Sequence, residues 1–194
     1  MDLETKTKQM DELKQKIIVN KVCGNLSQTA TQLVMGEGNL NSKIVFIGEA
    51  PGKNEDLQGR PFVGQSGKFL DEMLASINLK REDIYITNIV KYRPPQNRDP
   101  SDEEKRVFWP YLMRQLEIIN PTVIVTLGRH AMNCFIPNGK ISVDHGHLRD
   151  VVLHRDKTEY KWQVLPLYHP AVAIYNRNMK QTLLDDFTKV KDLL

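Results

Sequence analysis

Four short and largely apolar segments constrain the fold of this chain more than any other feature of its sequence. They span residues 43–47, 84–90, 122–127 and 162–168. Between them, apolar residues recur at the spacing of three and four that is typical of helices, as at Phe69, Met73 and Ile77. Strands that are apolar on both faces and that alternate with helices predict a parallel sheet with helices on both sides.

Local signals predict the ends of several helices. Apolar positions among Lys and Glu over residues 1–18 predict an amphipathic helix, so we expect residues 1–20 to pack on the body of the protein. Ser66 is the expected N-cap of the helix that contains Phe69. Ser101 and Glu104 form a capping box for a helix that runs to about residue 119, with a kink expected at Pro110.

The last third of the chain is less regular. We expect a hairpin within residues 140–161 and a closing helix marked by Met179 and Val190. Pro166 interrupts the fourth apolar segment, and because proline cannot donate to a strand ladder, we place that segment at the edge of the sheet.

Size and charge set broad limits on function. The chain has 194 residues, enough for one domain, residues 1–194, with its own core. A net charge of +3 excludes a strongly polycationic protein but permits a local basic surface. No apolar run approaches transmembrane length, so we expect a cytoplasmic protein that does not bind membranes. Cys23 and Cys134 are far apart and predict two reduced thiols rather than a metal site.

Three segments that follow the predicted strands carry unusual residues. They begin at Gly48, Asn88 and His169. Because ligands of parallel α/β sheets bind beyond the carboxyl ends of the strands, we expect Glu49, Asn88 and His169 to share one site.

The segment after the first strand reads GEAPGKNEDLQGRPFVGQSG. Its small residues Gly48, Ala50 and Gly52 would let a planar ligand approach the backbone closely. Its acids disfavour a phosphate at the same place, and no Gly-Lys-Ser or Gly-Lys-Thr sequence is present, so this is not a P-loop.

The other two segments have features of nucleic-acid binding. The amide of Asn88 suits the edge of a pyrimidine, and the basic residues Lys91 and Arg93 follow it among prolines, as suits a phosphate backbone. After His169 and Pro170 the chain is apolar from Val172 onward. Such residues either wedge into a base stack or begin a buried helix.

Together these segments resemble the uracil-DNA glycosylase superfamily, most closely its family 4. The resemblance rests on GEAPGKNEDLQGRPFVGQSG, YITNIVKYRPPQNR, PTVIVTLG and HPA, in that order, and extends from about residue 34 to the C-terminus. It implies a three-layer α/β/α sandwich with a central four-stranded parallel sheet. It also implies a monomeric, nucleoid-associated DNA-repair enzyme that hydrolyses the N-glycosidic bond of uracil in DNA.

The resemblance also implies roles for individual residues. Glu49 would be the catalytic carboxylate, which orients water or stabilises the sugar cation, and His169 would donate to uracil O2. Asn88 would read the base, Phe62 would stack on it, and Glu55 would lie near C5. Further uracil-binding residues would be Gly48, Ala50, Pro51 and Gly52. The implied DNA-binding residues are Gln65, Ser66, Lys91, Arg93, Pro170, Ala171 and Val172.

The sequence departs from family 4 in its cysteines. The resemblance would imply a [4Fe–4S] cluster held by four cysteines, but only Cys23 stands near a cluster position, and Tyr92 occupies another. We therefore expect no iron–sulfur cluster and no other cofactor. Packing of Tyr92, Phe108 and Trp109 would stabilise this region in place of the cluster.

A related branch of the superfamily traps DNA covalently through a histidine in a basic loop. The corresponding residues 92–100 contain no histidine here, so we expect turnover without a stable adduct.

Three other functions fit parts of the sequence. One is a glycosylase for another deaminated base such as hypoxanthine. Another is a catalytically degenerate DNA-binding relative, although such a protein has no need of Glu49. A metal enzyme would use Asp144, His145 and His147, but these residues lie far along the chain from the site motifs, and we expect no metal.

Overall fold

The computed structural model describes residues 1–155 and 158–193 and has a mixed sheet at its centre. The strands lie in the order β1-β3-β2-β4-β6-β5, and the four inner strands are parallel to one another. Their bounds are Glu37–Gly38 (β1), Ile44–Gly48 (β2), Tyr85–Asn88 (β3), Val123–Leu127 (β4), Arg149–Arg155 (β5) and Thr158–Leu167 (β6). The predicted four-stranded parallel sheet is thus confirmed as the core of a larger one.

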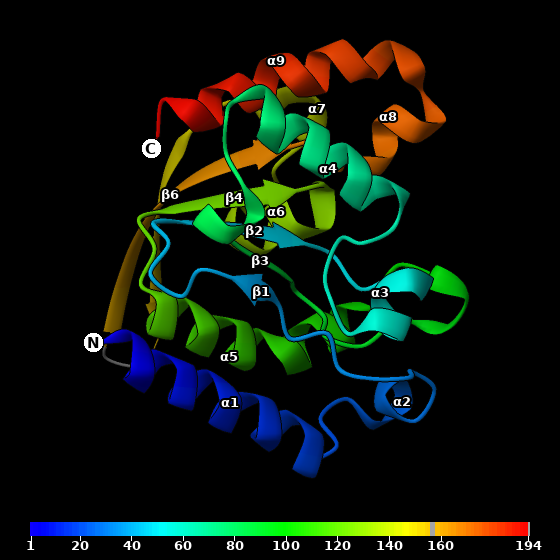
Figure 1. Ribbon diagram of the computed structural model, residues 1–194, viewed down its shortest axis with the longest axis vertical. Coiled ribbons are helices and arrows are strands. Elements are labelled where there is room, and N and C mark those ends of the chain that lie inside the picture. The colour runs from blue at the N-terminus through cyan, green and yellow to red at the C-terminus, as the bar shows by residue number, and fades with distance from the viewer. Residues whose placement is uncertain (156–157, 194) are drawn as a thin grey trace.

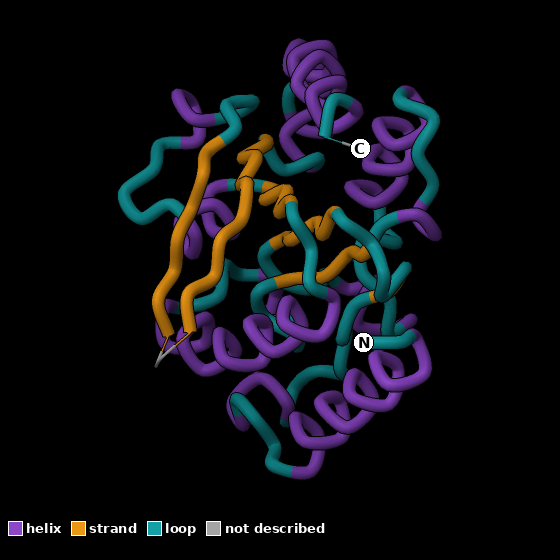
Figure 2. The backbone as a smooth tube through the Cα atoms, turned by 90° about the vertical axis from the view of Figure 1, so that its left-hand side faces the viewer, coloured by secondary structure: helices purple, strands orange, loops and turns teal. Residues whose placement is uncertain are grey.

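Helices cover both faces of the sheet, which confirms the predicted three-layer sandwich (Figures 1 and 2). α1 and α5 lie on one face, and α4 and α9 lie on the other. The helix bounds are Leu3–Val19 (α1), Gly24–Ser27 (α2), Lys53–Gln58 (α3), Gln65–Ser76 (α4), Asp102–Ile119 (α5), Arg129–Phe135 (α6), Ile141–Asp144 (α7), Ala171–Tyr175 (α8) and Lys180–Lys191 (α9). Short 3₁₀ turns are Arg81–Asp83 (η1), Pro95–Asn97 (η2) and Arg177–Met179 (η3).

Strand β2 shows why the sheet must be covered on both sides. All five of its residues are buried. Val45 and Ile47 pack into the core beneath α1 and α5, whereas Ile44 and Phe46 pack into the core beneath α4 and α9. Alternate side chains of a strand point to opposite faces, so a continuously apolar strand requires two cores.

Two antiparallel strands extend the sheet beyond its parallel part. β1 pairs with β3, and β5 pairs with β6 as the predicted hairpin, while residues 156–157 between them lie outside the described residues. The prediction that the strand of Pro166 forms the edge is wrong, because β6 lies between β4 and β5. The last β6 residue that pairs with β5 is Val164, so Pro166 lies beyond the part of β6 that β5 covers.

The local signals were mostly correct. The capping box is confirmed, with the Ser101 hydroxyl accepting from the Glu104 amide and the Glu104 carboxylate accepting from the Ser101 amide. α5 continues through Pro110 as one helix. The N-cap of α4 is Gly64 and not Ser66, which lies within the first turn. None of the described helices is long and apolar enough to span a bilayer.

A buried carboxylate joins the start of α5 to two neighbouring segments. Glu104 is 3% exposed and accepts from both terminal nitrogens of Arg98, at 2.8 and 2.7 Å. It also accepts from the Ser101 amide at 2.8 Å and from the Asn25 amide at 2.7 Å. Chiefly because of the Arg98 hydrogen bonds, the pKa of Glu104 is lowered to about 2.

We predict that Glu104→Gln lowers the free energy of unfolding by about 3 kcal/mol at pH 7. The folded-state pKa is depressed, so this stabilisation is present above the ordinary pKa of a glutamate and is lost as the pH falls towards 2. Urea denaturation of both proteins between pH 7 and pH 2 should therefore show a difference that shrinks with acidification.

The matched control is Glu103→Gln. Glu103 immediately precedes Glu104 in the sequence and forms an exposed ion pair with Arg106. This substitution should change stability by less than about 1 kcal/mol at every pH. If the difference in the free energy of unfolding between the wild type and Glu104→Gln were independent of pH, it would contradict the proposed ionic contribution.

Candidate active site

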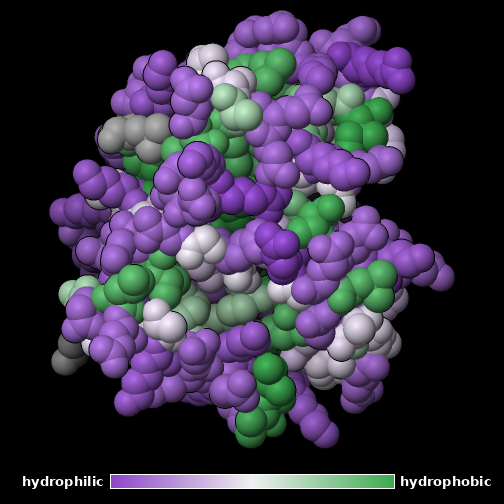
Figure 3. All heavy atoms as spheres, viewed as in Figure 1, coloured by the Kyte–Doolittle hydropathy of each residue, from purple (hydrophilic) through white to green (hydrophobic). Residues whose placement is uncertain are grey.

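A cavity of about 370 Å³ opens at the carboxyl ends of the parallel strands. The surface is hollowed on that side of the molecule, between the segment around α8 and the loops below it (Figure 3). The structure brings the three predicted segments together here, since Glu49, Asn88 and His169 all line the cavity. Its other lining residues are Ala50, Pro51, Gly52, Glu55, Phe62, Ser66, Pro94, Asn97, Arg98, Asp99, Ala171 and Tyr175.

Two glycines, Gly48 and Gly67, leave room for the residues that form the cavity wall. A Cβ atom on Gly48 would lie 2.4 Å from Asn88 Oδ1 and 2.5 Å from the Phe62 ring. A Cβ atom on Gly67 would lie 1.7 Å from the carbonyl oxygen of Phe62. Only glycine permits these approaches, so the two glycines fix where Phe62 and Asn88 stand.

Phe62 is held in a conformation that a bulky residue rarely adopts. Its φ is +51°, and its side chain is 5% exposed. Glu55 accepts from the next two backbone amides, of Val63 at 2.9 Å and of Gly64 at 2.8 Å. The Arg81 guanidinium donates to the Phe62 carbonyl oxygen. Glu55 lines the cavity and also anchors the turn that presents the aromatic ring.

Asn88 ends β3 with an amide that faces the cavity. The residue is 2% exposed, and no hydrogen bond within the described part of the chain engages its side chain. The amide group opens onto the cavity, so it is available to pair with a ligand there.

The prediction that Lys91 contacts DNA is wrong for this structure. Lys91 is completely buried, and its ammonium nitrogen donates to Thr87 Oγ1 at 2.7 Å and to the Asn88 carbonyl oxygen at 2.6 Å. Burial lowers the pKa of Lys91 well below its ordinary value. The chain turns inward after β3, so a residue that resembles a surface cation in the sequence instead braces the backbone of Asn88.

A backbone hydrogen bond sets the tautomer of His169. Its Nδ1 accepts from the Ala171 amide at 3.1 Å, which leaves Nε2 as the protonated nitrogen of the neutral ring. Its ring stacks on that of Phe62, with centroids 5.6 Å apart. Burial lowers the pKa of His169 to about 4. At neutral pH this side chain is therefore an uncharged donor at Nε2.

The carboxylate of Glu49 lies in a partly buried position beside another acid. Burial, and then the nearby negative charge of Asp99, raise the pKa of Glu49 to about 7. Arg129 and Lys105 oppose this effect with weaker, opposite contributions. Glu49 is thus close to half-ionised at neutral pH, as is typical of acid–base groups.

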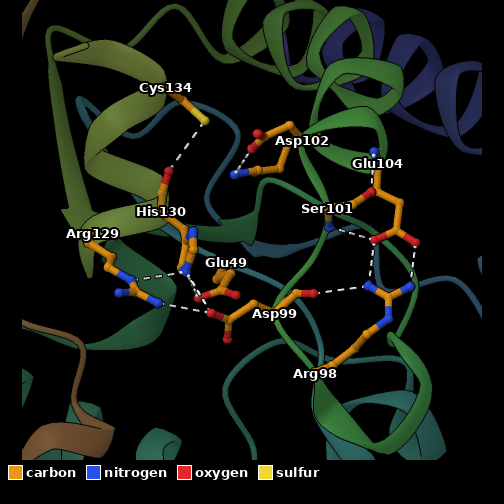
Figure 4. Close-up of polar contacts among 10 residues, drawn as sticks. Glu49, Arg98, Asp99, Ser101, Asp102, Glu104, Arg129, His130 and Cys134 are labelled. Atoms are coloured by element: carbon orange, nitrogen blue, oxygen red, sulfur yellow. Dashed lines mark hydrogen bonds and ion pairs between the residues drawn. The ribbon is translucent and has the colours of Figure 1, made fainter. Parts of the chain in front are cut away.

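A fourth segment meets the site, and the sequence interpretation missed it. His130 Nε2 lies 3.8 Å from Glu49 Oε2 and 3.0 Å from Asp99 Oδ2 (Figure 4). His130 follows Gly128, at the carboxyl end of β4, so the rule that located the other three segments also applied here. Ligand atoms of Glu49, Asp99 and His130 lie within 4.8 Å of one another, but Arg129 already donates to Asp99 and to His130.

The predicted DNA-binding residues take varied positions around the mouth of the cavity. Gln65 is exposed at the start of α4, Ser66 lines the cavity, and Arg93 is partly exposed with its Nε bound to Asn97. Pro170 is buried, Ala171 lines the cavity, and Val172 packs on the core. The apolar residues after His169 form helix α8, and its last residue, Tyr175, is 90% exposed and lines the cavity.

Asp144 and His145, two of the three residues that a metal enzyme would use, have other partners. Asp144 accepts from Arg149 at 2.9 Å, and His145 pairs with Asp186 of α9. Neither these two residues nor His147 is among the residues that line the cavity.

Several known proteins are similar to this chain. A sequence profile of the uracil DNA glycosylase superfamily matches residues 35–190. A Type-4 uracil-DNA glycosylase of Archaeoglobus fulgidus is 45% identical over 95% of this chain and 92% of that protein. Proteins of the same name are 43% identical over 95% of this chain and 84% of that protein in Sulfurisphaera tokodaii, and 42% identical over 84% of both chains in Thermotoga maritima.

We predict that Phe62→Ala raises the pKa of His169 from about 4 towards its ordinary value of 6.5. Removing the stacked ring would admit water to the imidazole and stabilise its charged form. Titration of the His169 ring protons by NMR measures this directly. Phe108→Leu, which alters a buried ring in the other core, should leave the His169 pKa unchanged. An equal shift in both variants would show a general loosening of the fold.

Proposed function

Because this chain belongs to the uracil DNA glycosylase superfamily, a family of enzymes, we propose that it removes uracil from DNA as the first step of base-excision repair. It flips the damaged nucleotide out of the helix and hydrolyses its N-glycosidic bond. The products are free uracil and an abasic site. The observation that carries this proposal is the meeting of Glu49, Asn88 and His169 in one cavity.

The shape and polarity of the cavity suit a flipped pyrimidine. Base flipping requires a pocket that stacks on the base and pairs with its edge. The Phe62 ring offers the apolar wall, and the unpaired Asn88 amide offers both a donor and an acceptor for the edge of uracil.

The chemistry requires two opposite electrostatic environments. As the bond between C1′ and N1 breaks, its electron pair leaves with uracil, and the sugar becomes cationic. The Nε2–H of neutral His169 donates to the oxygen on which negative charge develops. The ionised Glu49 carboxylate stabilises the sugar and takes a proton from the water that attacks C1′. The uracil anion then takes a proton from solvent.

DNA would lie across the mouth of the cavity. The N-terminus of α4, with Gln65 and Ser66, would hold a phosphate, and Arg93 would add a nearby positive charge. Exposure favours Tyr175 rather than Val172 as the side chain that enters the vacated stack. Tyr175→Ala should slow cleavage of duplex DNA more than that of single-stranded DNA.

We also propose that the enzyme resembles family 4 but works without an iron–sulfur cluster. Four thiolates hold such a cluster, and the residues here do not fit that requirement. Cys23 donates to Asn25, and burial raises the pKa of its thiol to about 11. Tyr92 packs edge-on against Phe108, and Cys134, the second of the two cysteines of the chain, belongs to α6.

The direct test of function is release of uracil from a labelled oligonucleotide in excess EDTA. Glu49→Ala and His169→Ala should each slow single-turnover cleavage by about 10²- to 10³-fold, because each removes a group that acts in the transition state. Hypoxanthine and thymine in place of uracil should not be released.

The matched controls are Glu12→Ala and His154→Ala, which alter exposed residues outside the cavity. Both should cleave at the wild-type rate. DNA binding by folded wild-type protein without uracil release would instead assign the protein to a binding class.

The cofactor proposal has its own measurement. Purified protein should show no broad absorbance near 400 nm and no stoichiometric iron, while retaining full glycosylase activity. A chromophore with about four irons per chain would contradict the proposal.

A further inference from the structure

His130 has an arrangement of partners that suits a residue which gains and loses a proton. Its Nε2 accepts from Arg129 Nε at 3.1 Å, which requires an unprotonated nitrogen. The same Nε2 lies 3.0 Å from Asp99 Oδ2, which is an acceptor for a protonated nitrogen. Arg129 thus supports the neutral ring and Asp99 supports the charged ring, so Nε2 has a partner in either form.

His130 also lies behind the residue that the proposed reaction needs as a base. Glu49 and Asp99 line the cavity, whereas His130 contacts them without being a lining residue itself. The Glu49 oxygen is 3.8 Å from Nε2, within reach of a proton transfer after a small rotation of either side chain (Figure 4). The His130 side chain is 20% exposed and so has a route to solvent.

We propose that Glu49, His130 and Asp99 form a proton relay in which His130 and Asp99 are positioning residues for Glu49. This inference rests on the proposed glycosylase function. The attacking water forms its bond to C1′ and gives a proton to Glu49. Glu49 passes that proton to Nε2 of His130, and Asp99 stabilises the resulting imidazolium. The proton then leaves to solvent, and Glu49 is ionised again for the next turnover.

Charged residues on every neighbouring segment affect the pKa of His130. Asp99 comes from the segment before α5, Asp102 and Lys105 from α5, and Arg129 from α6. Asp99 favours the charged form of His130, while burial, Arg129 and Lys105 oppose it, and the net effect lowers the pKa of His130 below 6.5. Near neutral pH the imidazole is therefore free to accept a proton.

The relay predicts a distinctive pH profile. The active form needs Glu49 ionised and His130 neutral, so activity rises with pH through the pKa of about 7 at Glu49. At pH values below the pKa of His130 as well, Glu49 and His130 both carry protons, and this doubly protonated form is inactive. The logarithm of the wild-type rate should then fall with a slope that approaches two, whereas His130→Gln leaves one titrating group and a slope of one.

His130→Gln should also lower the single-turnover rate at pH 7 by about 10- to 100-fold, at the lower end of what acid–base catalysis contributes. Its affinity for uracil-containing DNA should not change, because His130 does not line the cavity. The matched control is His145→Gln, which alters another His–Asp pair outside the site and should keep the wild-type rate and slope. A His130→Gln enzyme with the wild-type rate and slope would overturn the relay.

A second measurement tests whether Glu49 and His130 share a proton, and it needs neither catalysis nor a His130 variant. In the wild type, the ring protons of His130 should titrate in two steps by NMR, because a proton shared with Glu49 belongs to the pair. In Glu49→Gln they should titrate in one step. A single, identical step in both proteins would overturn the shared proton. If instead wild-type protein releases no uracil but shows two steps, the proposed function fails while the Glu49–His130 coupling stands.

Discussion

The ladder between β2 and β3 is the interaction on which the site depends. The two strands pair in parallel from Val45 and Tyr85 to Gly48 and Asn88. The hydrogen bonding continues past their ends, where Ile89 donates to the Gly48 carbonyl at 3.0 Å and Val90 donates to the Glu49 carbonyl at 3.0 Å. The proposed catalytic carboxylate of Glu49 and the proposed base-reading amide of Asn88 are therefore placed relative to each other by main-chain hydrogen bonds.

Burial then gives each ionisable group near this ladder a different use. It lowers the pKa of His169 to about 4 and raises that of Glu49 to about 7. An uncharged hydrogen-bond donor and a weakly basic carboxylate thus suit the two opposite electrostatic requirements of the proposed reaction, as is typical of sites that separate the pKa values of neighbouring groups. Lys91 is also buried, but its two hydrogen bonds direct it to the backbone of the site instead.

Aromatic and ionic contacts join the segment after β3 to α5, in the region where the resemblance to family 4 would imply a metal cluster. Tyr92 packs on Phe108 with ring centroids 6.0 Å apart, and Phe108 is fully buried. The paired Arg98 and Glu104 join the segment after β3 to α5, and Asn25 ties the N-terminal segment to the same carboxylate. These contacts stabilise the loop that carries Asp99 into the site.

The sequence by itself determined the layered fold and three of the four segments around the cavity. Apolar runs of five residues and helical spacing report which faces are buried, and parallel strands place their carboxyl ends at one edge, so Glu49, Asn88 and His169 could be predicted to meet. The tertiary structure alone decided that Lys91 turns inward, that Pro166 lies in an inner strand and that His130, among the residues after β4, faces Glu49. These outcomes depend on contacts between segments that are distant in the chain, such as those of Glu49 and His130, which are 81 positions apart. Local periodicity carries no information about such pairings, because it records whether a side chain is buried but not which side chain it meets.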